Sequence, residues 1–133
     1  QRFELWNNGW QIFKEHLLLG VGTGDVVDRC HKRLEETHSP LAGTGLHTHN
    51  QYLNFLLAFG LLGFLAILVA FGRAILVNHS CRSLLFTAFL CITLISFITE
   101  DTLETLAGIL FVALGFCLLD SRTTKIHLKK TNL

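Results

Sequence analysis

An apolar run from Leu53 to Val77 constrains this chain more than any other feature. The run is 25 residues long and holds one charged residue, Arg73, near its end. A helix needs roughly 20 apolar residues to cross about 30 Å of hydrocarbon. The run therefore predicts a membrane-spanning helix, and it places the polar segment just before it, residues 47–52, at a membrane surface.

Two further apolar runs follow, at about 83–99 and 106–119. Short polar connections separate the three runs, so we expect antiparallel neighbours. The predicted fold is an all-α membrane protein: an extracytoplasmic helical loop region (1–52), three transmembrane helices (53–119) and a basic cytoplasmic tail (120–133). Because the chain begins at Gln1 and contains no Met, we expect it to be a fragment of a larger polytopic fold.

The distribution of charge predicts the orientation. The link at 78–82, its flanks and the tail carry an excess of Lys and Arg, whereas the turn at Glu100 and Asp101 has no basic residue. The positive-inside rule places the link and the tail in the cytoplasm, and residues 1–50 and the acidic turn on the other side. The formal net charge of +1 gives no drive toward nucleic acid.

The first 50 residues predict two short helices and a loop. Residues 1–19 carry apolar side chains at spacings of three and four, which predicts one amphipathic face suited to the water–lipid interface. A second helix is expected over about 25–34 and a loop over 35–46. The predicted face of the first helix consists of Phe3, Trp6, Trp10, Phe13 and Leu17.

Glycines mark two positions along the chain. The GVGTGD segment at 20–25 departs from the dinucleotide fingerprint and lacks the Gly-Lys-Ser/Thr of a P-loop. We interpret it as a helix C-cap followed by a flexible turn. Gly60 and Gly63, inside the first apolar run, are expected to allow close contact between helices.

His47 and His49 are the candidates for chemistry. Zinc would need two further ligands, and Cys30, His31 and His38 offer no spacing that unites them with this pair, so we expect no metal. Histidine changes charge near neutral pH, which suits proton removal from a hydroxyl. The alternative is an ordinary histidine in a surface loop.

Arg2 and the acidic turn have structural alternatives. With Trp6 four residues on, Arg2 is either an anchor that reaches toward lipid phosphate or a guanidinium that binds a substrate phosphate, and the sequence alone favours the anchor. Glu100, Asp101 and Glu104 are interpreted as carboxylates that cap a helix N-terminus, with a secondary role in a site.

Taken in order, these motifs resemble the C-terminal part of the O-antigen ligase and polymerase superfamily of membrane glycosyltransferases. Two departures stand out: the proline usual before the GVG turn is absent, and Asp25 stands where Asn is common. The resemblance rests on Arg2 and Trp6, LLGVGTGD at 18–25, HTHNQYL at 47–53, FGLLG at 59–63, and Thr99, Glu100 and Asp101.

The resemblance implies an inverting transfer that needs no metal or other cofactor. A glycan would pass from an undecaprenyl-diphosphate carrier to a hydroxyl of lipid A-core or of a growing glycan, at the outer face of the bacterial inner membrane. It makes His49 the catalytic base, and a second essential arginine of the family would lie upstream, so this chain is not expected to form a complete site alone. The implied substrate-binding set is Arg2, on the diphosphate, with Trp6, His47, Asn50 and Tyr52.

Two other functions compete with the enzyme: a segment of a membrane permease, and an inactive truncated remnant. Transport usually leaves ionisable groups inside the spans. Here the apolar runs are nearly free of charge in their interiors and the polar groups collect outside them. This pattern favours chemistry at the membrane surface.

Overall fold

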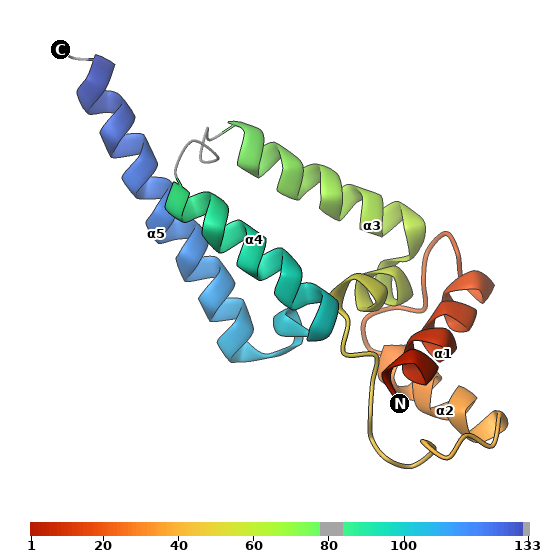
Figure 1. Ribbon diagram of the computed structural model, residues 1–133. Helices are drawn as coiled ribbons and strands as arrows, with labels where there is room; N and C mark the ends of the chain where they lie inside the picture. Colours follow the sequence, from red (N-terminus) through yellow and green to blue (C-terminus); the bar gives the residue numbers. More distant parts are fainter. Residues whose placement is uncertain (78–83, 132–133) are drawn as a thin grey trace.

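The computed structural model describes residues 1–77 and 84–131, and within these ranges all regular structure is helical (Figure 1). The prediction of an all-helical fold is therefore confirmed. In chain order the elements are α1 (Arg2–Glu15), α2 (Val26–Glu36), α3 (Gln51–Val77), α4 (Leu84–Thr99), the 3₁₀ helix η2 (Thr102–Glu104) and α5 (Leu106–Thr131).

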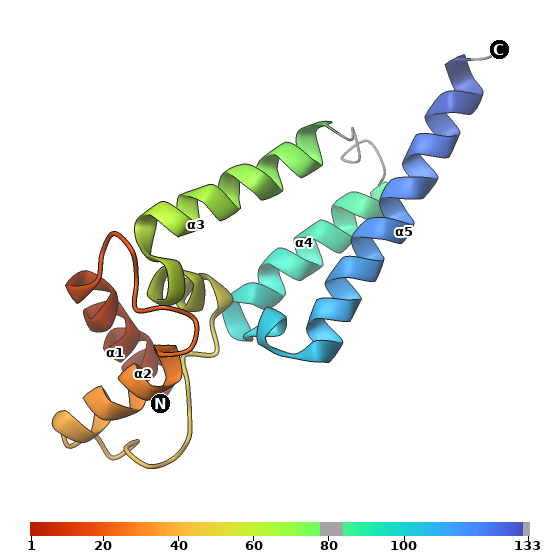
Figure 2. The same cartoon turned by 180° about the vertical axis from the view of Figure 1, so that it is seen from behind.

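The helices form two regions, visible from both sides in Figures 1 and 2. We call residues 1–60 the head: α1 and α2 pack there against the beginning of α3. We call the rest of α3, α4 and α5 the apolar helices, which extend away from the head. The turn between α4 and α5 lies at the head end of the apolar helices. It therefore lies beside the segment of the head that carries the histidines.

The core of the head differs from the predicted amphipathic face. Helix α1 lies between α2 and α3, so two of its sides are covered. Of the residues on the predicted face, Phe13 is buried, whereas Phe3 and Trp10 are 83% and 49% exposed. The side chains that α1 buries are Leu5, Asn8, Ile12 and Phe13, together with Gly9, so the buried face shares only Phe13 with the predicted interfacial face.

Helix α3 is interrupted at Gly60, which has φ 63° and ψ −169°. An interruption leaves backbone N–H and C=O groups without helical partners, and unpaired groups of this kind are costly to bury. The segment after α1 supplies the partners by lying across the break. The bonds run from Val21 N–H to Leu57 C=O (2.7 Å), Gly22 to Ala58 (3.0 Å), Leu61 to Leu17 (2.8 Å) and Leu62 to Leu18 (3.2 Å).

Two glycines make this crossing possible. Gly20 has φ +70°, and a Cβ there would lie 2.6 Å from the backbone nitrogen of Gly60; a Cβ on Gly60 would lie 2.5 Å from the nitrogen of Gly20. The GVGTGD segment is therefore a docked strap rather than a flexible turn, which corrects our interpretation. Gly60 serves this crossing, and a Cβ on Gly63 would meet Phe59 of its own helix, so neither glycine provides the helix contact we expected.

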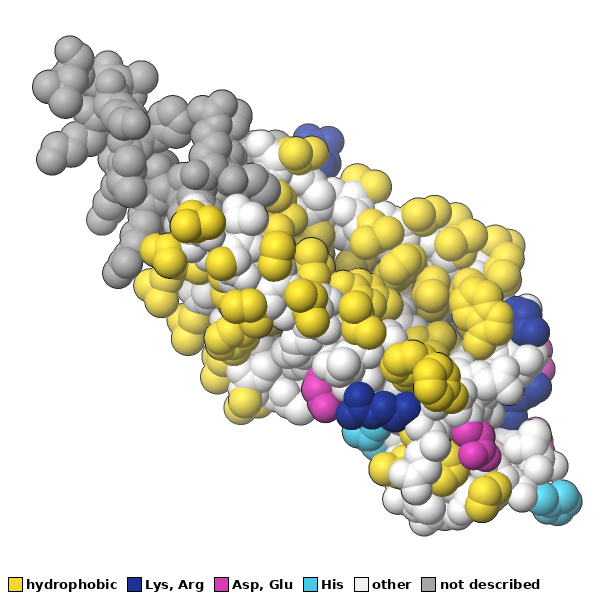
Figure 3. Space-filling view, viewed as in Figure 1, with side chains coloured by type: hydrophobic (Ala, Val, Ile, Leu, Met, Phe, Trp, Pro, Cys, Tyr) yellow, Lys and Arg dark blue, Asp and Glu magenta, His cyan; other side chains and the backbone are white. Residues whose placement is uncertain are grey.

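Among the described residues, one helix is both long and apolar enough to cross a membrane, Gln51–Arg73 within α3. The apolar parts of the other two helices, Leu84–Thr99 and Leu106–Leu119, are shorter. The structure thus supports one of the three predicted spans by length and composition. Leucine, isoleucine and phenylalanine side chains are exposed along all three apolar helices, and Figure 3 shows them gathered there.

The remaining predicted segments agree with the structure only approximately. Helix α2 ends two residues beyond the predicted 25–34, and residues 120–131 of the predicted tail continue α5 as helix. The predicted cytoplasmic link at 78–82 lies outside the described residues, as do residues 132 and 133.

Replacing either crossing glycine by alanine should destabilise the protein by about 2 kcal/mol or more, because a strained φ alone costs about 1–3 kcal/mol. Gly72→Ala is the matched control: it lies in α3 with nothing within 4 Å of a Cβ, so alanine should be neutral or slightly stabilising. The measurement is the temperature at which purified protein loses its monodisperse peak. Equal behaviour of Gly20→Ala and Gly72→Ala would contradict the crossing.

Candidate functional site

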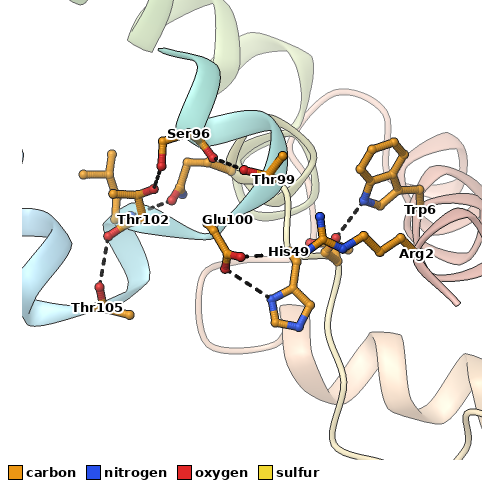
Figure 4. A network of polar contacts seen from close by, with 11 residues as sticks. Arg2, Trp6, His49, Ser96, Thr99, Glu100, Thr102 and Thr105 are labelled. Atoms are coloured by element: carbon orange, nitrogen blue, oxygen red, sulfur yellow. Dashed lines mark hydrogen bonds and ion pairs between the residues drawn. The ribbon is translucent and has the colours of Figure 1, made fainter. Parts of the chain in front are cut away.

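Three charged or polar side chains meet where the head touches the turn after α4 (Figure 4). Arg2 Nη2 lies 3.8 Å from Glu100 Oε1, and His49 Nδ1 lies 3.8 Å from Glu100 Oε2. One carboxylate thus stands between a guanidinium and an imidazole that come from segments almost 50 residues apart. All three side chains keep contact with solvent, so these pairs contribute little to stability and remain open to a ligand.

Trp6 fixes the histidine segment to α1. Its indole N–H donates to the carbonyl of Thr48 at 2.8 Å, and Thr48 itself is buried. This bond holds Thr48 against α1, so the side chains on either side of it, His47 and His49, face outward. In this structure the polar atom of Trp6 positions the loop.

Asn50 and Gln51 begin α3 and join it to the turn after α4. The side-chain oxygen of Asn50 accepts the N–H of Leu53 at 3.0 Å, which is the N-cap arrangement for a helix. Gln51 is completely buried, and its side-chain oxygen accepts the N–H of Leu103 at 2.7 Å. The same two residues thus start the helix and hold the acidic turn against it.

Tyr52 ties α3 to α4. Its hydroxyl donates to the carbonyl of Leu94 at 2.9 Å, and its ring stands edge-on to Phe97 with 6.0 Å between centroids. Like Trp6 and Asn50, it comes from the predicted substrate-binding set and here makes contacts that place other groups.

Asp101 lies against the backbone at His49. His49 has φ +45°, a left-handed conformation that is uncommon for residues other than glycine. The backbone N–H groups of His49 and Asn50 lie close enough to the carboxyl of Asp101 to affect its pKa. Burial raises the pKa of Asp101, and these N–H groups and the nearby imidazoles of His47 and His49 offset part of that rise. Asp101 therefore helps to aim the His49 ring.

The histidine rings form a short row. The rings of His47 and His49 are stacked with 5.6 Å between centroids, and His31 lies 6.5 Å beyond His47. In the part of the chain that the structure describes, no group of three or more His, Cys, Asp or Glu is arranged to hold a metal ion.

A cleft of about 320 Å³ opens beside this row, between α2, α3 and the acidic turn. Cys30 lies in its wall, where burial, with a smaller contribution from Asp101, raises the thiol pKa to about 11. A thiol that stays protonated is a poor nucleophile, so Cys30 acts as a small apolar residue. The cleft is lined by Thr23, Val26, Val27, Cys30, His47, Thr48, Asn54, Phe55, Ala58, Phe59, Asp101, Leu103 and Glu104.

The sequence predicted helix capping, and only a secondary role in a site, for the acidic turn. Asp101 precedes η2 but makes no side-chain capping bond to it, so the capping interpretation was wrong for this residue. Glu100 pairs with Arg2 and His49, and Glu104 accepts the side-chain N–H of Asn54 at 2.8 Å. A signal was present, since these three are the only acidic residues between 53 and 119.

A helical head joined to long apolar helices, with a histidine, an arginine and carboxylates at the junction, defines a protein built for work at an apolar boundary. Residues 1–68, just over half of the chain, match the O-antigen ligase family, and the chain belongs to that family. The match confirms the resemblance and spans Arg2, the histidine segment and the break at Gly60. No curated protein and no solved structure matches the chain.

Asp101→Asn should stabilise the protein at about pH 7 and leave it unchanged in acid. The pKa of Asp101 is higher in the folded state than in the unfolded one, so ionisation opposes folding. Below the unfolded value, about 3.9, both states are protonated; stability is then lost as the pH rises through the folded value. An asparagine has nearly the same size and cannot ionise, and its side-chain oxygen can still face the two N–H groups.

The measurement is the difference in unfolding temperature between Asp101→Asn and wild type, followed from acid, below the unfolded pKa, up to about pH 7. Asp28→Asn, on an exposed turn of α2, is the matched control and should show no such trend. A difference that grows on acidification would contradict the burial of Asp101.

Proposed function

We propose that this chain carries the acceptor-activating part of a membrane glycosyltransferase of the O-antigen ligase type. The donor is a glycan on undecaprenyl diphosphate, and the acceptor is a hydroxyl of lipid A-core, or of a growing glycan if the enzyme is a polymerase. One observation carries the proposal: within a chain of this family, Arg2 and His49 converge on one carboxylate at the head end of the apolar helices.

His49 acts as the general base. Its Nδ1 atom faces Glu100, which leaves Nε2 as the atom that takes the proton from the acceptor hydroxyl. The hydroxyl oxygen forms a bond to the anomeric carbon while the bond from that carbon to the diphosphate oxygen breaks. The electron pair of the broken bond stays on the diphosphate. Direct displacement of this kind inverts the anomeric centre.

Arg2 stabilises the leaving group. A lipid diphosphate gains negative charge as it leaves, so it needs fixed cations more than a proton donor. The guanidinium of Arg2 is half exposed and its ion pair with Glu100 is long, so it is free to turn toward a phosphate. A guanidinium also offers two parallel N–H groups to a phosphate, which an ammonium does not.

We further propose the predicted arrangement in a bacterial inner membrane, with residues 1–52 outside, three spans within 53–119 and residues 120–133 inside. The head and the acidic turn lie at the same end of the apolar helices. This supports the arrangement, because the charge distribution assigns both of them to the outer side. The ionisable groups of the site lie at that end rather than within the apolar helices, which favours an enzyme over a permease. An inactive remnant would transfer no glycan.

In the full-length protein, replacement of His49 should lower glycan transfer by about 10²–10⁴-fold, the usual contribution of a general base. His49→Asn is the sharper variant, because asparagine tolerates the left-handed backbone at this position. His38→Ala is the matched control, since His38 also has positive φ (49°) and is exposed away from the site. Transfer is measured from lipid-linked glycan at matched membrane levels of protein; near-normal rates for His49→Asn would refute the assignment.

Arg2→Lys separates phosphate binding from anchoring. If Arg2 holds the diphosphate, lysine should lower transfer by roughly tenfold or more and raise KM for the lipid donor, because it cannot reproduce the paired N–H contact. A simple anchor needs only a positive charge on a long stem, which lysine supplies. Transfer rates equal to wild type would remove Arg2 from the site.

A further inference from the structure

We propose that the cleft beside the histidine row binds a sugar ring of the acceptor glycan. This inference rests on the proposed function and adds the place and the residues of acceptor recognition. We call the pocket the acceptor cleft and define it by His47, Asn54, Phe55, Phe59, Asp101 and Glu104. Its volume, about 320 Å³, is that of a small-molecule site.

One wall of the acceptor cleft is aromatic. Phe55 and Phe59 follow each other by one turn of α3, and their ring centroids lie 6.2 Å apart. Phe59 remains 38% exposed, although it lies next to the backbone crossing at Gly60. Val27 of α2 is also exposed and stands in the cleft lining. A sugar ring presents C–H groups on its faces, so it can lie on a wall of this kind while its hydroxyls point elsewhere.

The other wall offers hydrogen-bond acceptors. Asn54 donates to one oxygen of Glu104 at 2.8 Å, which holds both side chains in place. A carboxylate has about four lone-pair sites, so Glu104 can still accept from ligand hydroxyls. Oδ1 of Asp101 has no hydrogen-bond partner among the described residues. The cleft therefore pairs an apolar face with polar acceptors, as a hydroxyl-rich ring requires.

Charge assigns the cleft to the acceptor and not to the donor phosphates. Its lining contains two carboxylates, Asp101 and Glu104, and neither lysine nor arginine. An anionic diphosphate would be repelled there. Arg2 does not line the cleft; it approaches His49 through Glu100.

The cleft lies next to the proposed base through His47, whereas Arg2 reaches that base through Glu100. His47 lines the cleft, and its ring is stacked 5.6 Å from the ring of His49. A sugar held in the cleft thus lies one ring away from the proposed base, while the cation that meets the diphosphate reaches the same base by way of Glu100. Donor and acceptor need not compete for one set of contacts.

The test measures KM for each substrate separately in the full-length protein, in vesicles that contain lipid-linked glycan donor and lipid A-core acceptor. Glu104→Gln removes a charge from the cleft, and Val27→Trp fills it from an exposed position. Each should raise KM for the acceptor about tenfold, as expected for one lost charge-assisted hydrogen bond or a blocked site, with KM for the donor unchanged. The matched controls are Glu35→Gln and Asp28→Trp, both exposed on α2 outside the cleft lining.

Unchanged acceptor KM in both cleft variants would overturn the inference, as would a parallel rise in donor KM. These outcomes differ from failure of the proposed function, in which wild type transfers no glycan or His49→Asn transfers normally. Should Glu104→Gln lose its monodisperse peak, Val27→Trp decides alone, because a side chain that is 41% exposed can be enlarged without disturbing the core.

Discussion

The contact between the backbones at Gly20 and Gly60 holds the rest of the structure in place. It lets α3 break while four of its backbone N–H and C=O groups keep partners, since residues 17–22 after α1 form four hydrogen bonds across the gap. The short first part of α3 then belongs to the head, where Leu53 and Leu57 pack against α1 and α2. The histidine segment precedes that part directly, so its position follows from the same crossing.

Contacts of charged side chains then position the groups around the histidine segment. The turn after α4 brings three carboxylates to a surface that already carries histidines and an arginine. Asp101 lies against the main chain at His49, Glu100 contacts the side chains of His49 and Arg2, and Glu104 contacts Asn54 in the lining of the cleft. Three neighbouring acids thus serve three distinct tasks, and none of them acts chiefly on the helix that it precedes.

Much of this could be predicted from the sequence, because apolar periodicity and glycine positions locate helices well. The order of the elements and the boundary near residue 51 followed directly, and the histidine segment remains the predicted site. The break at Gly60 could not be predicted, since the hydrophobic pattern of an apolar run is the same whether its helix is continuous or broken. The buried face of α1 was missed because α1 has two neighbours, and the role of Asp101 because its partners lie about 50 residues away.

In the proposed membrane arrangement, the break at Gly60 also limits how far the candidate site can lie from the hydrocarbon. Beyond Gly60, α3 keeps residues 61–77, which are 17 residues or about 25 Å of helix. Hydrocarbon is about 30 Å thick, so in the proposed arrangement the bilayer thins around the protein or the head sinks into the headgroup layer. Exposed Phe3, Trp10 and Leu19 on the head suit that layer. The diphosphate of the proposed lipid-linked donor would lie at the same depth, so under the proposed function it could react without being lifted out of the membrane.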